Sequence, residues 1–128
     1  MSETTVNYGL RYRRFALDII RLVSGLRKYH HYEIISQITR SSISIGANFQ
    51  ESRAARTDKE FIGILSISLR EARETKYLLE IIRDLNLLSS KEVGRLRRES
   101  IEITNILAAS ILTKKLNIKK NKKIKIKK

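Results

Sequence analysis

The shortage of helix-breaking residues is the feature that most limits what this chain can fold into. It contains no proline in 128 residues and only five glycines, so long uninterrupted helices are favoured. Apolar residues recur at intervals of three and four along four successive segments, as they do in the helices of a bundle. We therefore predict an all-α protein, with one antiparallel up-down-up-down four-helix bundle formed by residues 11–116.

The predicted helices cover about residues 12–28, 33–55, 58–85 and 91–116. Thr57 and Glu60 have the S/T-x-x-E spacing of a capping box, which places the start of the third helix. Asn86 is expected to end that helix, and Ser89 or Ser90 to cap the fourth. Residues 1–10 are polar and have no sustained period, so we expect a flexible lead-in there.

Two parallel stripes run along the second predicted helix. Ile38, Ser42, Ile45 and Phe49 fall on a narrow core arc, and a stripe of small polar residues lies beside it. Small side chains there let another helix backbone come close, so a leucine at Gly46 or Ser42 should harm folding or assembly more than a change of one arginine. The residues predicted to serve the core or the assembly are Gln37, Ser41, Ser42, Ser44, Ile45, Gly46, Asn48, Glu51 and Glu71.

No pattern of catalytic or cofactor-binding residues is present. The chain has no cysteine, no glycine-rich phosphate loop and no histidine placed to activate a serine. His30 and His31 are adjacent and lack the spacing of metal ligands, so we expect them to cap the first helix. Glu51 and Glu71 are expected to pair with arginines such as Arg40. We predict a protein that is not an enzyme and needs no metal or cofactor.

Basic residues are concentrated at the C-terminal end. The net charge is +14, and nine of the 27 basic residues lie in residues 114–128, which leaves +5 on the remainder. Such an excess favours an anionic partner, most often nucleic acid. Residues 117–128 are expected to be disordered; the alternative is a basic extension of the fourth helix, ordered only against a polyanion. The candidate contacts are Arg11, Arg13, Arg14, Arg53, Arg56, Arg95, Arg97, Arg98, Lys114, Lys115, Lys119, Lys120, Lys122, Lys123, Lys125, Lys127 and Lys128.

A resemblance to a known family covers residues 15–115. It rests on the sequence EFIGILSISLREARETKYLL at residues 60–79 and on a preceding set of spaced residues, which are Gln37, Arg40, Ser41, Ser42, Ser44, Ile45, Asn48 and Glu51. Together they resemble the four-helix-bundle proteins, which include proteins encoded in intervening sequences of bacterial large-subunit ribosomal RNA genes. Members form pentamers. A related accessory protein of diversity-generating retroelements is a basic pentameric barrel that binds nucleic acid and a reverse transcriptase.

The residues and the resemblance together lead to one expected function. We expect a cytoplasmic homo-oligomer, a pentamer by resemblance, that binds RNA or DNA without strong sequence specificity and acts beside a partner such as a reverse transcriptase. No apolar run approaches the roughly 20 residues of a membrane span, so no membrane partner is expected. The alternative is a protein–protein scaffold or adaptor whose basic residues serve solubility.

Overall fold

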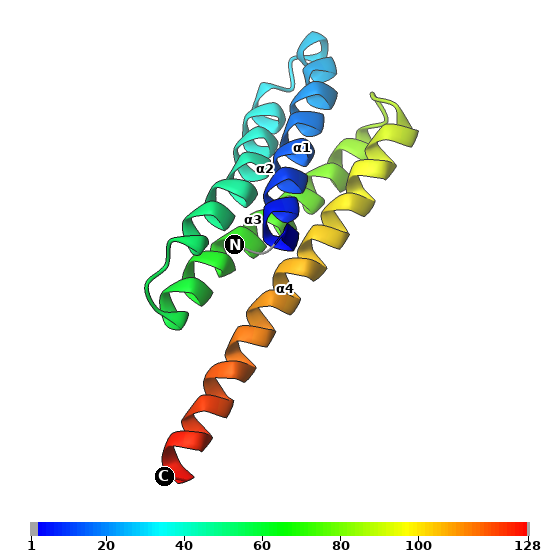
Figure 1. Cartoon of the computed structure of the whole chain (residues 1–128). Coiled ribbons are helices and arrows are strands. Elements are labelled where there is room, and N and C mark those ends of the chain that lie inside the picture. Colours follow the sequence, from blue (N-terminus) through cyan, green and yellow to red (C-terminus); the bar gives the residue numbers. More distant parts are fainter. Residues whose placement is uncertain (1–2, 128) are drawn as a thin grey trace.

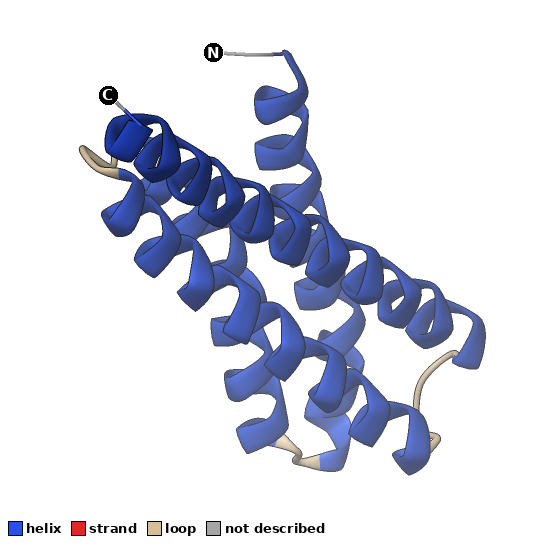
Figure 2. Ribbon diagram, turned by 90° about the horizontal axis from the view of Figure 1, so that it is seen from below, coloured by secondary structure: helices blue, strands red, loops and turns tan. Residues whose placement is uncertain are grey.

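A computed structural model of the chain describes residues 3–127, with the side chains of residues 7–125. It contains the helices α1 (Glu3–Val23), α2 (Tyr32–Arg53), α3 (Asp58–Leu85) and α4 (Ser90–Lys127), with the short 3₁₀ helix η1 (Ser24–Tyr29) after α1. The direction of the chain reverses at each connection between the four long helices (Figure 1). Only helices and short turns occur over residues 3–127 (Figure 2). The predicted all-α four-helix bundle is confirmed.

The apolar seam of each helix is buried at the centre of the bundle. In α2 the predicted core arc is confirmed, because Ile38, Ser42 and Ile45 are at most 1 % exposed and Phe49 is 7 % exposed. Leu65, Ala72 and Leu79 form the matching seam of α3, and Leu96, Ile103 and Leu107 that of α4. The buried Ser68, Thr75 and Ser100 fill the positions between them, so the seam recurs every three or four residues and each long helix turns one continuous face inward.

Small hydroxyl residues bring α2 and α3 close together. Ser41 and Thr75 are both fully buried and their hydroxyl oxygens hydrogen-bond at 2.8 Å. The Ser68 hydroxyl donates to the Ile45 carbonyl oxygen across the same interface at 2.6 Å. A buried hydroxyl needs such a partner, and the short side chains let the two backbones approach. The predicted close approach therefore involves Ser41, whereas Gln37 is exposed and Ser44 and Asn48 are half-buried.

The predicted helix caps are confirmed at three boundaries. The Thr57 hydroxyl accepts a hydrogen bond from the Glu60 backbone N–H at 3.1 Å, and α3 begins at the next residue, Asp58. The Ser89 hydroxyl accepts from the Glu92 backbone N–H at 3.3 Å. Asn86 ends α3 in the left-handed conformation, with a φ of 54° that asparagine tolerates better than most residues.

The prediction of a flexible lead-in over residues 1–10 is wrong from Glu3 onward, because α1 already begins there. Residues 1 and 2 lie outside the described part of the chain. Tyr8 anchors this first stretch, since its ring stacks on that of the buried Tyr12 with the centroids 6.3 Å apart. A single anchoring aromatic leaves no periodic signal in the sequence, and the contact that stabilises these turns is a tertiary one.

The junction between α1 and α2 is capped by backbone geometry and not by an imidazole ring. Regular α-helix ends at Val23 and continues as η1 to Tyr29. His30 then takes the left-handed conformation with a φ of 63°, and its backbone N–H donates to the Arg27 carbonyl oxygen at 3.0 Å. His30 is thus at the predicted cap position, but the cap is formed by its main chain.

The prediction that residues 117–128 are disordered is also wrong as far as Lys127, because α4 continues to that residue. The helix continues as in the alternative named above, and its dependence on a polyanion stays a prediction. Lysine is a good helix former, and no proline or glycine occurs in this stretch. Among the described side chains beyond Ile111, none is fully buried, so intrinsic propensity and not packing accounts for these turns.

Replacing Gly63 with alanine is expected to stabilise the protein by about 0.5–1 kcal/mol. Gly63 lies inside α3 without a positive φ, and a Cβ added there would meet nothing within 4 Å. Glycine in a helix interior costs about that much relative to alanine, mainly through the entropy of the unfolded chain. Urea unfolding of Gly63→Ala at fixed protein concentration measures the change; an unchanged or lowered midpoint would contradict the assignment of an open, regular helical site.

Candidate nucleic-acid interface

The extension of α4 presents the densest positive charge in the described structure. It projects past the connection between α2 and α3, away from the other helices (Figure 1). Lys115, Lys119, Lys120, Lys122, Lys123 and Lys125 are all exposed. Lys127 is the last residue of α4, and Lys128 lies outside the described residues. At about 1.5 Å per residue, residues 117–127 lengthen the helix by roughly 16 Å.

Three of the arginines predicted to contact nucleic acid are instead engaged in ion pairs between helices, as is Lys114, which pairs with Asp58. Arg11 of α1 donates to Glu99 of α4 from its Nε at 2.8 Å and from its Nη2 at 2.7 Å, and it also pairs with Glu102. These hydrogen bonds, that to Glu99 first, raise the pKa of Arg11 above its ordinary value. Charge that is already paired in this way has less attraction left for a phosphate.

Arg95 and Arg97 of α4 are paired in the same manner. Arg95 contacts Asp18 of α1 at 3.1 Å and also Glu92 one turn away; its hydrogen bonds, that to Glu92 first and then that to Asp18, raise its pKa. Arg97 pairs with Glu80 of α3 at 2.9 Å. These pairs link α4 to both of its neighbours, which gives the two arginines a role in the bundle itself.

The other predicted arginines differ in how accessible they are. Arg13, Arg14, Arg56 and Arg98 are exposed and make no ion pair with a described carboxylate. Arg53 is half-buried at the end of α2, where its guanidinium carbon lies 5.9 Å from the centroid of the Phe49 ring. Its Nη2 atom is buried and has no hydrogen-bond partner among the described residues. The four exposed arginines are therefore the ones best placed to contact a phosphate.

The carboxylates of the α2 and α3 seams are not gathered into a metal site. Glu71 pairs with Arg40 at 3.1 Å, as predicted, and Glu74 pairs with the same arginine at 2.7 Å. Glu51 is exposed. Among the described residues, no group of three or more histidine, aspartate or glutamate side chains could hold a metal ion.

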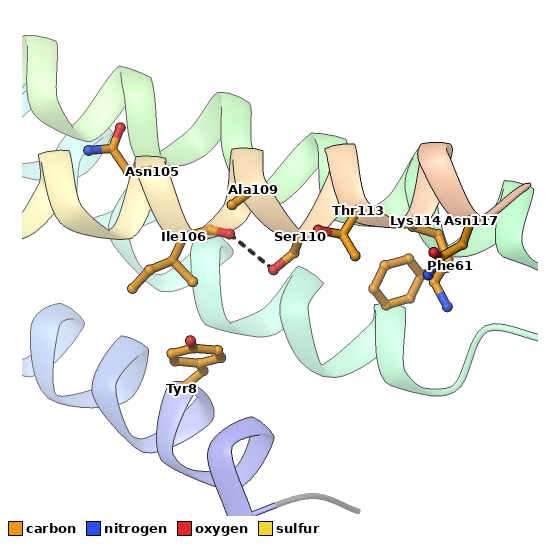
Figure 3. Close-up of a pocket in the computed structure, with 9 residues that line it drawn as sticks. All are labelled: Tyr8, Phe61, Asn105, Ile106, Ala109, Ser110, Thr113, Lys114 and Asn117. Carbon is orange, nitrogen blue, oxygen red and sulfur yellow. Dashed lines mark hydrogen bonds between the residues drawn. The ribbon is translucent and has the colours of Figure 1, made fainter. Parts of the chain in front are cut away.

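A groove lies next to the first turns of the α4 extension. It has a volume of about 580 Å³, and α1, α3 and α4 all contribute to its walls (Figure 3). Tyr8 and Ile106 face each other across one end, and Phe61 lies beside Lys114 and Asn117 at the other (Figure 3). The lining consists of Tyr8, Phe61, Asn105, Ile106, Ala109, Ser110, Thr113, Lys114 and Asn117.

Sequence reasoning did not find this groove, although a signal for it was present. Asn105, Ala109, Thr113 and Asn117 recur at four-residue spacing on α4, so they share one face of the helix. This uncharged face continues directly into the lysine-rich extension. This face alone does not indicate a groove, because the opposite wall includes Tyr8. Tyr8 lies in the stretch that the sequence predicts to be flexible.

A second, more apolar groove runs between α1 and α2. Its volume is about 340 Å³, and it is bordered by the exposed side chains of Leu17, Ile20 and Ile43. Gly46 forms part of its floor, where an added Cβ would lie 3.4 Å from the Cβ of Tyr12. Three large exposed apolar residues around one groove are typical of a protein-binding surface.

No helix among those described has a stretch long and apolar enough to cross a lipid bilayer.

Comparison with known proteins identifies the family. The chain is similar to a crystal structure of a protein of unknown function from the S23 ribosomal protein family of Bacteroides thetaiotaomicron, with 31 % sequence identity and a TM-score of 0.76. The match covers 81 % of this chain and 97 % of the other. No curated protein matches the chain. The model of the 23S rRNA-intervening sequence protein family matches residues 10–109, and this chain therefore belongs to that family.

Proposed function

We propose that this protein is a non-enzymatic nucleic-acid-binding bundle, which acts as a homo-oligomer and holds RNA or DNA through its phosphates. The observation that carries the proposal is the extension of α4. Its lysines between Lys119 and Lys125 are exposed on a helix that projects away from the bundle, where they contribute nothing to the buried core. Lysines displayed on a projecting segment attract phosphates of any sequence, because the attraction is electrostatic.

The exposed arginines of the bundle support the same proposal. Arg13 and Arg14 of α1, Arg56 before α3 and Arg98 of α4 add positive charge outside the extension. None of the four helices has the features of a recognition helix with a defined register on a DNA groove, so the binding is proposed to be independent of sequence. The biological setting we propose is that of an accessory factor to a nucleic-acid-processing protein, such as a reverse transcriptase.

Assembly would multiply this charge. Each copy carries nine basic residues in residues 114–128, so several extensions in one particle would engage one polyanion at once. Such multivalent contact raises the overall affinity without any strong single contact. The apolar groove between α1 and α2 is the proposed contact with a second copy. The same chain also exposes Leu112 and Leu116, one turn apart on α4, as side chains of a kind that would fill such a groove.

We expect the protein to have a solution mass several times its monomer mass of 14.9 kDa, with a pentamer as the predicted number. Replacing Ile43, which is 47 % exposed, with glutamate should dissociate it because a charge would be buried at the contact. Tyr77→Glu is the matched control, since Tyr77 is 62 % exposed on α3 and does not border the groove. Light scattering at tens of micromolar measures the mass, and a monomeric wild type would contradict the proposal.

A protein–protein scaffold is the second candidate function, and the apolar groove is the observation that favours it. In that case the groove binds a different protein and the basic residues serve solubility. Mixing the protein with unrelated RNA and DNA at two salt concentrations separates the two functions. Nucleic-acid binding that weakens steeply with salt supports the first, and no binding at low salt supports the second.

A further inference from the structure

The groove between α1, α3 and α4 has the size of a ligand site and opens beside the basic extension. Its volume of about 580 Å³ falls within the roughly 300–1,000 Å³ that is usual for such sites. None of its nine lining residues is acidic, and Lys114 is cationic. The lining therefore presents rings, amides and hydroxyls to an anionic ligand without a repelling carboxylate of its own.

Two aromatic rings in the lining are held in place from behind. Tyr8 stacks on Tyr12 at an interplanar angle of 13°, and Tyr12 in turn contacts Phe49 edge-on with the centroids 5.1 Å apart. Phe61 packs against the hydrophobic core and is half-buried, as is Tyr8. Aromatic rings that are partly exposed but fixed by the core suit the binding of single-stranded nucleic acid, because an unpaired base can stack on them at little entropic cost.

The α4 wall of the groove offers hydrogen bonds that suit the edges of bases. The side chains of Asn105, Thr113 and Asn117 are exposed. An amide both donates and accepts, so it can pair with any base edge. The hydroxyl of Ser110 already donates to the Ile106 carbonyl oxygen at 3.0 Å, and its lone pairs remain free to accept a hydrogen bond.

Lys114 connects the groove to the extension. Its Nζ lies 4.9 Å from the centroid of the Phe61 ring and 3.3 Å from Asp58 Oδ1. Because Lys114 is paired with Asp58, it has less attraction left for a phosphate, and the phosphates are bound mainly by the exposed lysines beyond it. Lys120 is seven residues, or about two helical turns, beyond Thr113, so it lies on the same face of α4 as the groove, where a strand leaving the groove would meet it.

We propose that this groove binds single-stranded nucleic acid, with bases stacked on Tyr8 and Phe61 and the adjoining phosphates bound by the lysines of the extension. This inference rests on the proposed function and specifies its ligand. A duplex has both faces of its inner bases already stacked, so it would bind through the extension alone and leave the rings unused. The preference for single strands comes from the groove, whereas the affinity shared by all nucleic acids comes from the lysines.

Phe61→Trp gives a direct test of stacking, because the chain contains no tryptophan and the new side chain would be its sole indole. The probes are oligothymidylate and oligouridylate of about 12 nucleotides, within the usual site size. A duplex of the same length and inorganic polyphosphate are the controls. We expect both single strands to quench the tryptophan fluorescence and both controls to leave it unchanged. The strand that reaches half-maximal quenching at the lower concentration identifies DNA or RNA as the preferred ligand.

Substitutions that remove one ring at a time test the affinity. Phe61→Leu and Tyr8→Leu keep an apolar side chain, and each should weaken single-strand binding at least about fivefold while duplex binding stays the same. Tyr8→Phe keeps the ring and should bind like the wild type. Tyr77→Leu removes an exposed aromatic outside the groove and is the matched control. Thermal melts check that each variant is folded. If Phe61→Leu does not fold, the comparison of single-strand affinity between Tyr8→Leu and Tyr8→Phe tests the proposal.

The outcomes distinguish this inference from the function on which it rests. One outcome is that all probes bind with equal affinity, the tryptophan is not quenched and the ring substitutions have no effect. That outcome would contradict binding in the groove but would not contradict the proposed electrostatic binding of nucleic acid. A wild type that binds no nucleic acid at low salt would overturn both. Selective quenching by single strands, together with the fivefold losses, supports the proposal.

Discussion

Removal of residues 117–128 is expected to lower the slope of log affinity against log salt concentration by about 3, with little change in thermal stability. The segment carries seven lysines, and each phosphate neutralised on duplex DNA contributes about 0.9 to that slope. Because the lysines are distributed around a helix, roughly half of them can face one duplex at a time. The core is unaffected because no described side chain beyond Ile111 is fully buried.

The measurement is a titration of labelled duplex and single-stranded oligonucleotides at several salt concentrations, for the full chain and the truncated one. A matched variant in which Lys119, Lys120, Lys122 and Lys123 are replaced by glutamine keeps the helix and removes only the charge. This variant should show most of the decrease in slope that truncation causes. If truncation leaves the slope unchanged, the extension does not bind the phosphates. The candidates for that role are then Arg13, Arg14, Arg56 and Arg98.

Replacing Ser68 with leucine is expected to destabilise the protein by about 1–3 kcal/mol, among the largest effects of any single substitution outside the apolar core. Ser68 is fully buried where α3 meets α2, and its hydroxyl oxygen lies 2.6 Å from the Ile45 carbonyl oxygen. A leucine must push the two helices apart or adopt a strained rotamer. Ser68→Ala loses only the hydrogen bond and should cost about 1 kcal/mol.

Gly63→Leu is the matched control, since it introduces the same side chain into the same helix at a position with open space. Its stability should equal or exceed that of the wild type. Urea unfolding at one fixed protein concentration compares the variants, because oligomers gain stability with concentration. Equal midpoints for Ser68→Leu and Gly63→Leu would show that the α2–α3 interface is looser than its hydrogen bonds indicate.

The sequence predicts those parts of the fold that depend on local signals. The bounds of α3 follow from the Thr57 cap and from Asn86, both of which act within one turn of the helix end. The seam of α2 follows from periodicity. The family resemblance stated from residues 37–79 is confirmed by the family match. Each of these signals is contained in a few neighbouring residues.

The parts that the sequence does not predict depend on contacts between distant residues. Arg11 and Glu99 are 88 positions apart, so nothing in either stretch indicates that the arginine is paired. The first turns of α1 depend on Tyr8 reaching the buried Tyr12. The groove beside Lys114 depends on how α1, α3 and α4 are placed relative to one another. Which predicted arginines are available for binding was therefore visible only in three dimensions.

The extension of α4 has a further consequence, which concerns its own helical order. Lys115, Lys119 and Lys123 stand four residues apart, and like charges at that spacing oppose a helix by a few tenths of a kcal/mol per pair. Dissolved ions screen this repulsion over about 10 Å at 0.1 M, so added salt strengthens the last turns while it weakens their hold on phosphates. Ionic strength thus acts on the extension in two opposite directions. A bound polyanion removes this opposition, because its phosphates neutralise the lysines whose mutual repulsion weakens the helix.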